Sequence, residues 1–168
     1  MGERLTKSDV EKIEKEIEER KLVQRPKLIE AVKEARAQGD LSENFEYYAA
    51  KREKNMNESR IRYLERMLKF ATIVEEKASA DDEVALNKTV LVYFPEDDET
   101  ESFRIVTSIR GNSLKGLISI DSPMGRALLH RRVGDTVYVK VNENVGYNVI
   151  IREISKAQDD SGDAIRQY

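Results

Sequence analysis

The segment Gly39-Asp40-Leu41-Ser42-Glu43-Asn44 separates two long, highly charged stretches that each have the composition of a helix. Gly39 is typical of a residue that ends a helix. Asp40, three residues before Glu43, is typical of the start of the next helix, in the manner of a capping box. The simplest interpretation is a helical hairpin whose tip, residues 39–44, carries two acidic side chains.

The composition limits the class of protein. The chain has 168 residues and no cysteine, which allows one or two domains and excludes a disulfide framework or a thiolate metal site. No apolar run reaches the roughly 18–20 residues of a membrane span, and the N-terminus lacks the apolar region of a signal peptide. We therefore expect a cytoplasmic protein without a membrane partner. With 36% charged residues and a net charge of -3, it lacks the strong basicity of many DNA-binding domains.

Charge and residue types change along the chain, which predicts two domains. Positive and negative charges nearly balance in residues 1–77, whereas residues 78–168 have an excess of acids, most of the glycines and several β-branched stretches. We therefore predict a hairpin domain over residues 1–77 and a second domain over residues 83–155. The polar residues 156–168 are predicted to be disordered.

The two arms of the hairpin differ in regularity. In the first arm, Pro26 predicts a kink or a break, because proline removes a backbone donor and clashes with the preceding turn. The return helix has no internal glycine or proline, and we expect it to run from near Leu41 or Ser42 to about Ala71, about 30 residues or 45 Å. An approximate heptad predicts its seam residues, which are Phe45, Ala49, Met56, Tyr63, Met67 and Phe70, with the stripe widened near its end by Leu64, Leu68 and Ala71.

Beyond residue 82 the hydrophobic pattern changes to the alternation that is typical of strands. The predicted strands are 89–94, 102–109, 116–120, 136–141 and 147–154. Ser122 suits the N-cap and Pro123 the first position of a short helix over residues 124–129. The second domain is therefore predicted to be a small antiparallel sheet crossed by one short helix, and the whole chain to be α+β.

Several motifs stand together in one register. They are Arg25-Pro26, Ala35-Arg36, the tip segment, Glu46-Tyr47 and Ala49-Ala50-Lys51 in the first domain, followed by Gly116-Leu117-Ile118-Ser119, Ser122-Pro123, Arg126-Ala127-Leu128 and Gly134-Asp135 in the second. With these motifs the chain resembles the Gre transcript cleavage factors of bacterial RNA polymerase over roughly residues 5–155. The resemblance implies an N-terminal antiparallel coiled coil and a C-terminal FKBP-like domain.

The resemblance also implies a mechanism. The C-terminal domain would dock at the rim of the polymerase secondary channel, and the coiled coil would pass down the channel to place the tip acids beside the active site. The polymerase would then hydrolyse the 3′ portion of backtracked nascent RNA, and elongation would resume. The factor would not be an enzyme itself and would have no cofactor of its own. Its partners would be the polymerase, with its active-site Mg²⁺, and the RNA 3′ end; we expect a monomer.

Asp40 and Glu43 are the candidate catalytic residues. Hydrolysis by two metal ions needs a second Mg²⁺ and an oriented water. Because Mg²⁺ is often held by only one or two protein carboxylates, Asp40 could be a ligand of that ion, with Glu43 supporting it or positioning the attacking water. The alternative interpretation is ordinary capping, since acids are also favoured at the start of a helix.

Further candidates lie on both domains. The residues expected to contact RNA or the polymerase are Arg36, Asn44, Tyr47, Lys51 and Arg52, with a solvated charged face as the alternative for the basic ones. For Tyr47 the alternative is that it braces the tip. The residues expected to dock on the polymerase are Ser122, Pro123 and Met124; the neighbouring Leu128 and Leu129 could instead be core.

A second function remains open, because the family includes paralogues that bind the same channel and inhibit the polymerase. The retained Gly-Asp-Leu-Ser-Glu-Asn tip favours a cleavage factor over an inhibitor. Resemblance to the FKBP fold does not imply prolyl isomerase activity, since a fold does not determine a function.

Overall fold

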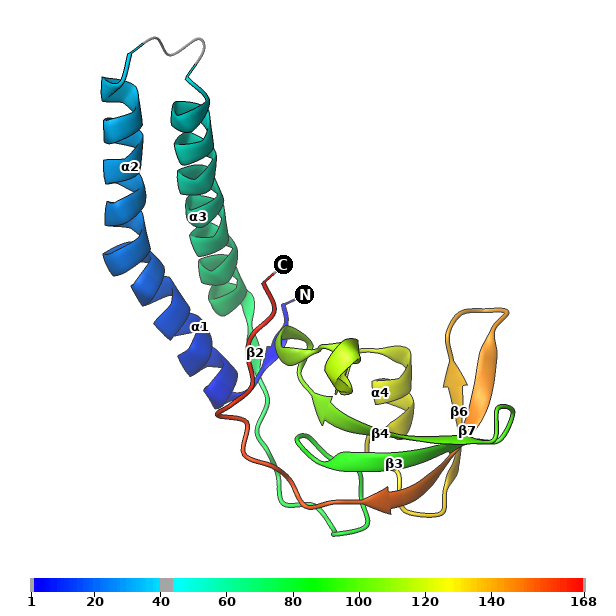
Figure 1. The fold of residues 1–168 in the computed structure, drawn as a ribbon. Helices are drawn as coiled ribbons and strands as arrows, with labels where there is room; N and C mark the ends of the chain where they lie inside the picture. Colours follow the sequence, from blue (N-terminus) through cyan, green and yellow to red (C-terminus); the bar gives the residue numbers. More distant parts are fainter. Residues whose placement is uncertain (1, 40–43, 168) are drawn as a thin grey trace. The chain divides into compact units, whose positions relative to one another are not determined.

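A computed structural model describes residues 2–39 and 44–167 (Figure 1). The chain forms two compact units, residues 10–71 with Gly2, and residues 3–9 with the chain from residue 72 onward. The division differs from the predicted boundaries at residues 77 and 83. The short strands β1 (Arg4–Leu5) and β2 (Thr72–Ile73) pair in parallel, which draws both segments into the second unit.

The first unit is a helical hairpin, as predicted. Its first arm consists of α1 (Lys7–Glu19), a π-helical segment (Arg20–Gln24) and α2 (Arg25–Ala37), and its second arm is α3 (Phe45–Phe70). The interruption expected at Pro26 takes the form of the π-helical segment, in which the Arg25 N–H donates to the Arg20 carbonyl. Pro26 then lies in the first turn of α2, where its missing donor costs least. The first arm bends here (Figure 1).

The predicted seam of α3 is mostly wrong. Its buried residues are Tyr47, Asn57, Ile61, Leu64 and Met67. Of the expected seam residues, those that are exposed instead are Phe45, Ala49, Met56, Tyr63 and Phe70. Phe45 is 85% exposed. The buried stripe of α3 includes the polar residue Asn57 and the half-buried Lys54. A prediction based on apolar residues alone therefore selects a neighbouring face of the helix.

The start of α3 also differs from the prediction. The helix begins at Phe45 with Asn44 as its N-cap, and it spans 26 residues, or about 39 Å. The start predicted near Leu41 or Ser42 lies outside the described residues, as does the proposed capping by Asp40 and Glu43. An Asn N-cap is among the most favourable, because its side chain accepts a bond from an otherwise unpaired N–H.

The second unit is built on a five-stranded sheet with strand order β5-β4-β3-β7-β6. The strands are β3 (Thr89–Phe94), β4 (Glu99–Val106), β5 (Leu117–Ser119), β6 (Thr136–Lys140) and β7 (Gly146–Ile154). All pairs are antiparallel except β4 with β5, which is parallel, so the sheet is mixed and not purely antiparallel as predicted. Between β4 and β5 the chain forms two short 3-10 helices, Ser108–Arg110 and Ser113–Lys115, before β5 runs parallel to β4.

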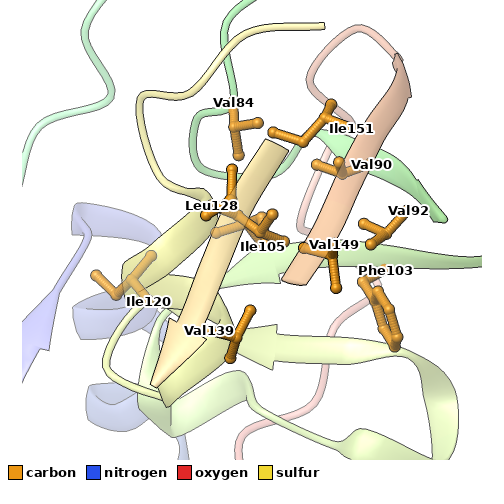
Figure 2. Packing of buried hydrophobic residues seen from close by; sticks show 11 residues of the cluster. Val84, Val90, Val92, Phe103, Ile105, Ile120, Leu128, Val139, Val149 and Ile151 are labelled. Carbon is orange, nitrogen blue, oxygen red and sulfur yellow. The ribbon is translucent and has the colours of Figure 1, made fainter. Parts of the chain in front are cut away.

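The short helix α4 (Pro123–Leu128) packs on the sheet around a hydrophobic core (Figure 2). The core residues are Val84, Val90, Val92, Phe103, Ile105, Ile120, Leu128, Val137, Val139, Val149 and Ile151. Leu128 is fully buried and Leu129 packs partly buried against the cluster, so the core interpretation of both is confirmed. Burying each such side chain contributes about 1.5–3 kcal/mol, which makes this core the main source of stability of the unit.

The C-terminal segment, predicted to be disordered, is part of the second unit and packs against the rest of it. The Gln158 N–H donates to the Asn87 carbonyl at 2.9 Å, and the Arg166 N–H donates to the Ile109 carbonyl at 2.7 Å. Ile165 is buried. The segment is polar and acidic, as the sequence indicates, but its acids pair with arginines of the folded unit, which composition alone cannot reveal.

Candidate functional site

At the tip of the hairpin, the side chain of Asn44 connects α2 to α3. Its Oδ1 accepts a hydrogen bond from the Tyr47 N–H at 3.0 Å, which caps the start of α3. Its Nδ2 donates to the Ala35 carbonyl at 2.6 Å, in the last turn of α2. The Ala35 carbonyl also accepts from the N–H of Gln38, the C-cap of α2, at 3.3 Å, so the Asn44 amide is its second donor. One amide therefore links the end of one helix to the start of the other.

Gly39 follows the end of α2 with φ +128°, a conformation that favours glycine. Its predicted role as a helix terminator is consistent with this geometry. The candidate catalytic residues Asp40 and Glu43 lie outside the described residues. The described flanks of this segment are residues 35–39 on one side and the chain from Asn44 on the other.

Beside the tip, an aromatic ring and basic side chains form a second cluster. Tyr47 is only 8% exposed. The Arg36 guanidinium lies 5.6 Å and the Lys51 ammonium 6.0 Å from the centre of the Tyr47 ring, distances typical of cation–π contacts. A hydrogen bond from Arg36, with the positive charges of Lys51 and Lys54, outweighs burial and lowers the pKa of Tyr47.

Four of the five expected contact residues thus lie together. Arg36, Asn44, Tyr47 and Lys51 form one cluster, whereas Arg52 is exposed on α3 outside these contacts. The near-complete burial of Tyr47 favours the interpretation that it braces the tip. The adjacent Tyr48 packs edge-on against it, with ring centres 5.4 Å apart, and is about half exposed.

The expected docking residues form the start of α4. Ser122 is its N-cap, as predicted: its Oγ accepts from the Gly125 N–H at 3.0 Å and donates to the Ser119 carbonyl at 2.7 Å. Pro123 is the first residue of the helix, and Met124 packs partly buried against the core. A Cβ on Gly125 would lie 1.8 Å from the Ser119 carbonyl oxygen, so this turn requires glycine.

The second unit contains a buried ionic network that was not predicted from the sequence. Arg110 is fully buried and pairs through Nε with Asp9 at 2.7 Å and through Nη1 with Asp163 at 2.9 Å. Nη1 also donates to the Asn87 side chain at 2.8 Å. In the sequence, this network is indicated only by the acidic character of the C-terminal segment. Its ion pairs join Arg110 to residues that lie far away in the chain.

Within residues 2–39 and 44–167, no three His, Cys, Asp or Glu side chains gather closely enough to hold a metal ion. In the same part of the chain, no helix is both long and apolar enough to span a membrane.

Comparison with known proteins identifies the class. Residues 3–73 match the family model described as "Transcription elongation factor, N-terminal", and residues 78–156 match "Transcription elongation factor, GreA/GreB, C-term". The transcription elongation factor GreA of Streptococcus pneumoniae (strain ATCC BAA-255 / R6) is 43% identical over 152 residues, which cover 90% of this chain and 94% of the relative. The GreA of Streptococcus sanguinis (strain SK36) matches with the same identity and coverage.

Solved structures also match. The GreA factor homolog 1 protein of Thermus thermophilus is 28% identical, with 93% of this chain and all of that chain covered and a TM-score of 0.43. The sequence matches define a transcription elongation factor made of a helical hairpin and a C-terminal sheet domain. The chain belongs to the GreA/GreB transcription elongation factor family. It is a transcript cleavage factor of the GreA type, an accessory factor and not an enzyme.

Proposed function

We propose that this chain acts on bacterial RNA polymerase by inserting its hairpin into the secondary channel, where the tip stimulates cleavage of backtracked nascent RNA. The observation that carries the proposal is the closed tip. Asn44 links α2 to α3 directly beside the segment that contains Asp40 and Glu43. Two carboxylates on a rigid support suit a site that another protein completes.

Within this proposal Asp40 is a ligand of a Mg²⁺ ion that it shares with the polymerase, and Glu43 supports Asp40 or positions the attacking water. The ion would supply charge stabilisation and an activated water. Two carboxylates are sufficient for a shared ion, because Mg²⁺ is commonly held by one or two protein groups with water and phosphate.

The basic cluster would bind the 3′ portion of the RNA. Arg36 and Lys51 flank Tyr47, and Arg52 is exposed on the same helix as Lys51. Contacts between such residues and phosphates are electrostatic and weaken with salt. Stimulation of cleavage should therefore fall as ionic strength rises, and more steeply in the intact protein than in a Lys51→Gln, Arg52→Gln variant.

We place polymerase docking on the start of α4, with Ser122, Pro123 and Met124 as contact residues. Ser122 and Pro123 are half-buried and hold this turn in a defined conformation. The factor would act as a monomer in the cytoplasm, where the polymerase works. The inserted hairpin would contact the RNA 3′ end while the second unit stays at the channel rim.

A cleavage assay tests the proposal. Stalled, backtracked elongation complexes carrying 3′-labelled RNA are incubated with Mg²⁺ and the intact protein. The proposal predicts release of short labelled fragments and resumed elongation, with no cleavage of free RNA. Slower elongation without fragment release would identify an inhibitor of the polymerase instead.

A further inference from the structure

Both kinds of polar atom on the Asn44 side chain are engaged by the hairpin itself. Oδ1 accepts from the Tyr47 N–H at 3.0 Å and Nδ2 donates to the Ala35 carbonyl at 2.6 Å. The backbone of Asn44 is not helical, with φ -91° and ψ 88°, so the residue lies at the junction of the tip and α3. Its side chain spans nine residues of sequence to reach α2.

Capping alone does not explain why this residue is asparagine. Asp, Ser and Asn cap a helix about equally well, because each offers an oxygen to the first free N–H groups. Only an amide adds a donor at the same distance from the backbone, and here that donor meets Ala35. The hydrogen bond to Ala35, and not the capping bond, therefore distinguishes asparagine from the other capping residues at this position.

The second bond closes the chain between Ala35 and Asn44. Residues 40–43 lie within this closed segment, and they include both acids. Joining the ends of a segment reduces the conformations open to the residues between them. Catalytic groups must be held to within about 0.5 Å of the productive geometry. A bond that holds both ends of the tip can therefore act on the reaction without touching RNA.

We propose that Asn44 is a positioning residue, which links the two flanks of residues 40–43 and thereby limits the conformations open to Asp40 and Glu43 during the cleavage reaction. This inference rests on the function proposed above. It replaces the expectation that Asn44 contacts RNA or the polymerase directly. The bond to Ala35 is the feature on which the positioning depends.

The test separates the clamp from the cap. Asn44→Ser retains a capping oxygen but is too short to reach Ala35, and Asn44→Asp keeps the size and the cap but replaces the donor with an acceptor. Asn55→Ser changes the same side chain at an exposed position of α3 and serves as the matched control. Each variant is titrated against backtracked complexes at several Mg²⁺ concentrations. Circular dichroism checks that the helices are intact.

A positioning role predicts that Asn44→Ser and Asn44→Asp lower the cleavage rate at saturating factor by about 10- to 100-fold, the cost of misplacing a reacting group by about 1 Å. The factor concentration that gives half-maximal stimulation should not change. Asn55→Ser should behave as the unmodified protein. In an Asp40→Asn, Glu43→Gln background, Asn44→Ser should cause no further loss, because the groups through which it acts are gone.

Three results would overturn the inference. The first is a normal saturating rate for Asn44→Ser together with a normal Asp40→Asn defect. The second is a loss of affinity with a full rate at saturation, which identifies a direct contact. The third is a further loss in the background without the acids. Full activity of the Asp40→Asn, Glu43→Gln protein is a different outcome, which overturns the proposed function itself.

Discussion

The carboxylate of Asp9 accepts a hydrogen bond from Nε of Arg110 at 2.7 Å, and neither side chain is exposed to solvent. The second oxygen of Asp9 accepts from the Thr6 N–H at 2.9 Å and from the Thr107 hydroxyl at 2.7 Å. The buried acid is therefore fully paired, and within the second unit it connects the N-terminal residues 3–9 with the segment that follows β4. Removing one partner of such a buried ion pair is strongly destabilising, because the other charge is left buried without compensation.

Arg110→Ala should destabilise the second unit by roughly 3–5 kcal/mol, because it leaves the Asp9 carboxylate buried without its counter-charge. The loss is measurable as reduced hydrogen-exchange protection of β3 and β7 and as a lower urea midpoint. Arg132→Ala is the matched control. Arg132 pairs with Asp82 at 2.6 Å, but about half of each side chain is exposed, so its loss should cost less than about 1 kcal/mol. Equal costs for the two variants would contradict the account.

The packing of the C-terminal segment should depend on pH through Asp163. Burial raises the pKa of this carboxyl, but hydrogen bonds from Arg104 and Arg110 outweigh it and hold the pKa below its usual range. A lowered pKa in the folded state stabilises the protein above the unfolded value of about 3.9, and the stabilisation is lost as the pH falls through the folded pKa. Proteolysis with an acid-active protease should therefore release the segment only at strongly acidic pH.

Asp163→Asn should release the same segment at neutral pH, at a cost of about 2 kcal/mol for the lost charged hydrogen bonds. Its proteolysis should then no longer change over the acidic range in which the unmodified protein opens. A variant that keeps the acid-dependent transition would show that another group is responsible.

Gly125→Ala should destabilise the second unit by about 1–3 kcal/mol, since the added methyl group would lie 1.8 Å from the Ser119 carbonyl oxygen. Thermal unfolding measures the effect. Gly162 has nothing within 4 Å of an added Cβ and no positive φ, so Gly162→Ala is the control and should leave the midpoint nearly unchanged. A tolerated Gly125→Ala would mean that the turn at the start of α4 can relax.

Asn57 should stabilise the hairpin although it occupies the seam of α3. Its Oδ1 accepts from the Arg20 guanidinium at 2.8 Å and its Nδ2 donates to the Arg20 carbonyl at 3.3 Å, within the π-helical segment. Asn57→Ala should cost about 1–3 kcal/mol by leaving these buried groups unpaired. Asn55→Ala on the exposed face should have little effect. Circular dichroism of the helical signal under urea distinguishes the two.

Local signals predicted the parts of the fold that depend on neighbouring residues. The strand Thr89–Phe94 has its predicted bounds, and Ser122 with Pro123 begins a short helix as predicted. These features follow from alternation and capping, which act over a few residues. The motif register also identified the family correctly.

Features that depend on distant partners could not be predicted in this way. The seam of α3 includes Asn57, whose amide bonds to Arg20 on the other arm, and a pattern of apolar residues does not reveal such a position. The C-terminal segment is ordered because Asp163 meets the buried Arg110. At the tip, the motif indicated that Asn44 was important, but only the structure showed that its amide reaches Ala35.

The central claim is that the tip acids drive transcript cleavage by the polymerase. The most direct measurement is the rate of fragment release from backtracked complexes at saturating factor, for the intact protein and for Asp40→Asn, Glu43→Gln. The account predicts that the double variant still competes with the intact protein for the polymerase but has lost most of the stimulation. Cleavage by the double variant at the rate of the intact protein would contradict the claim.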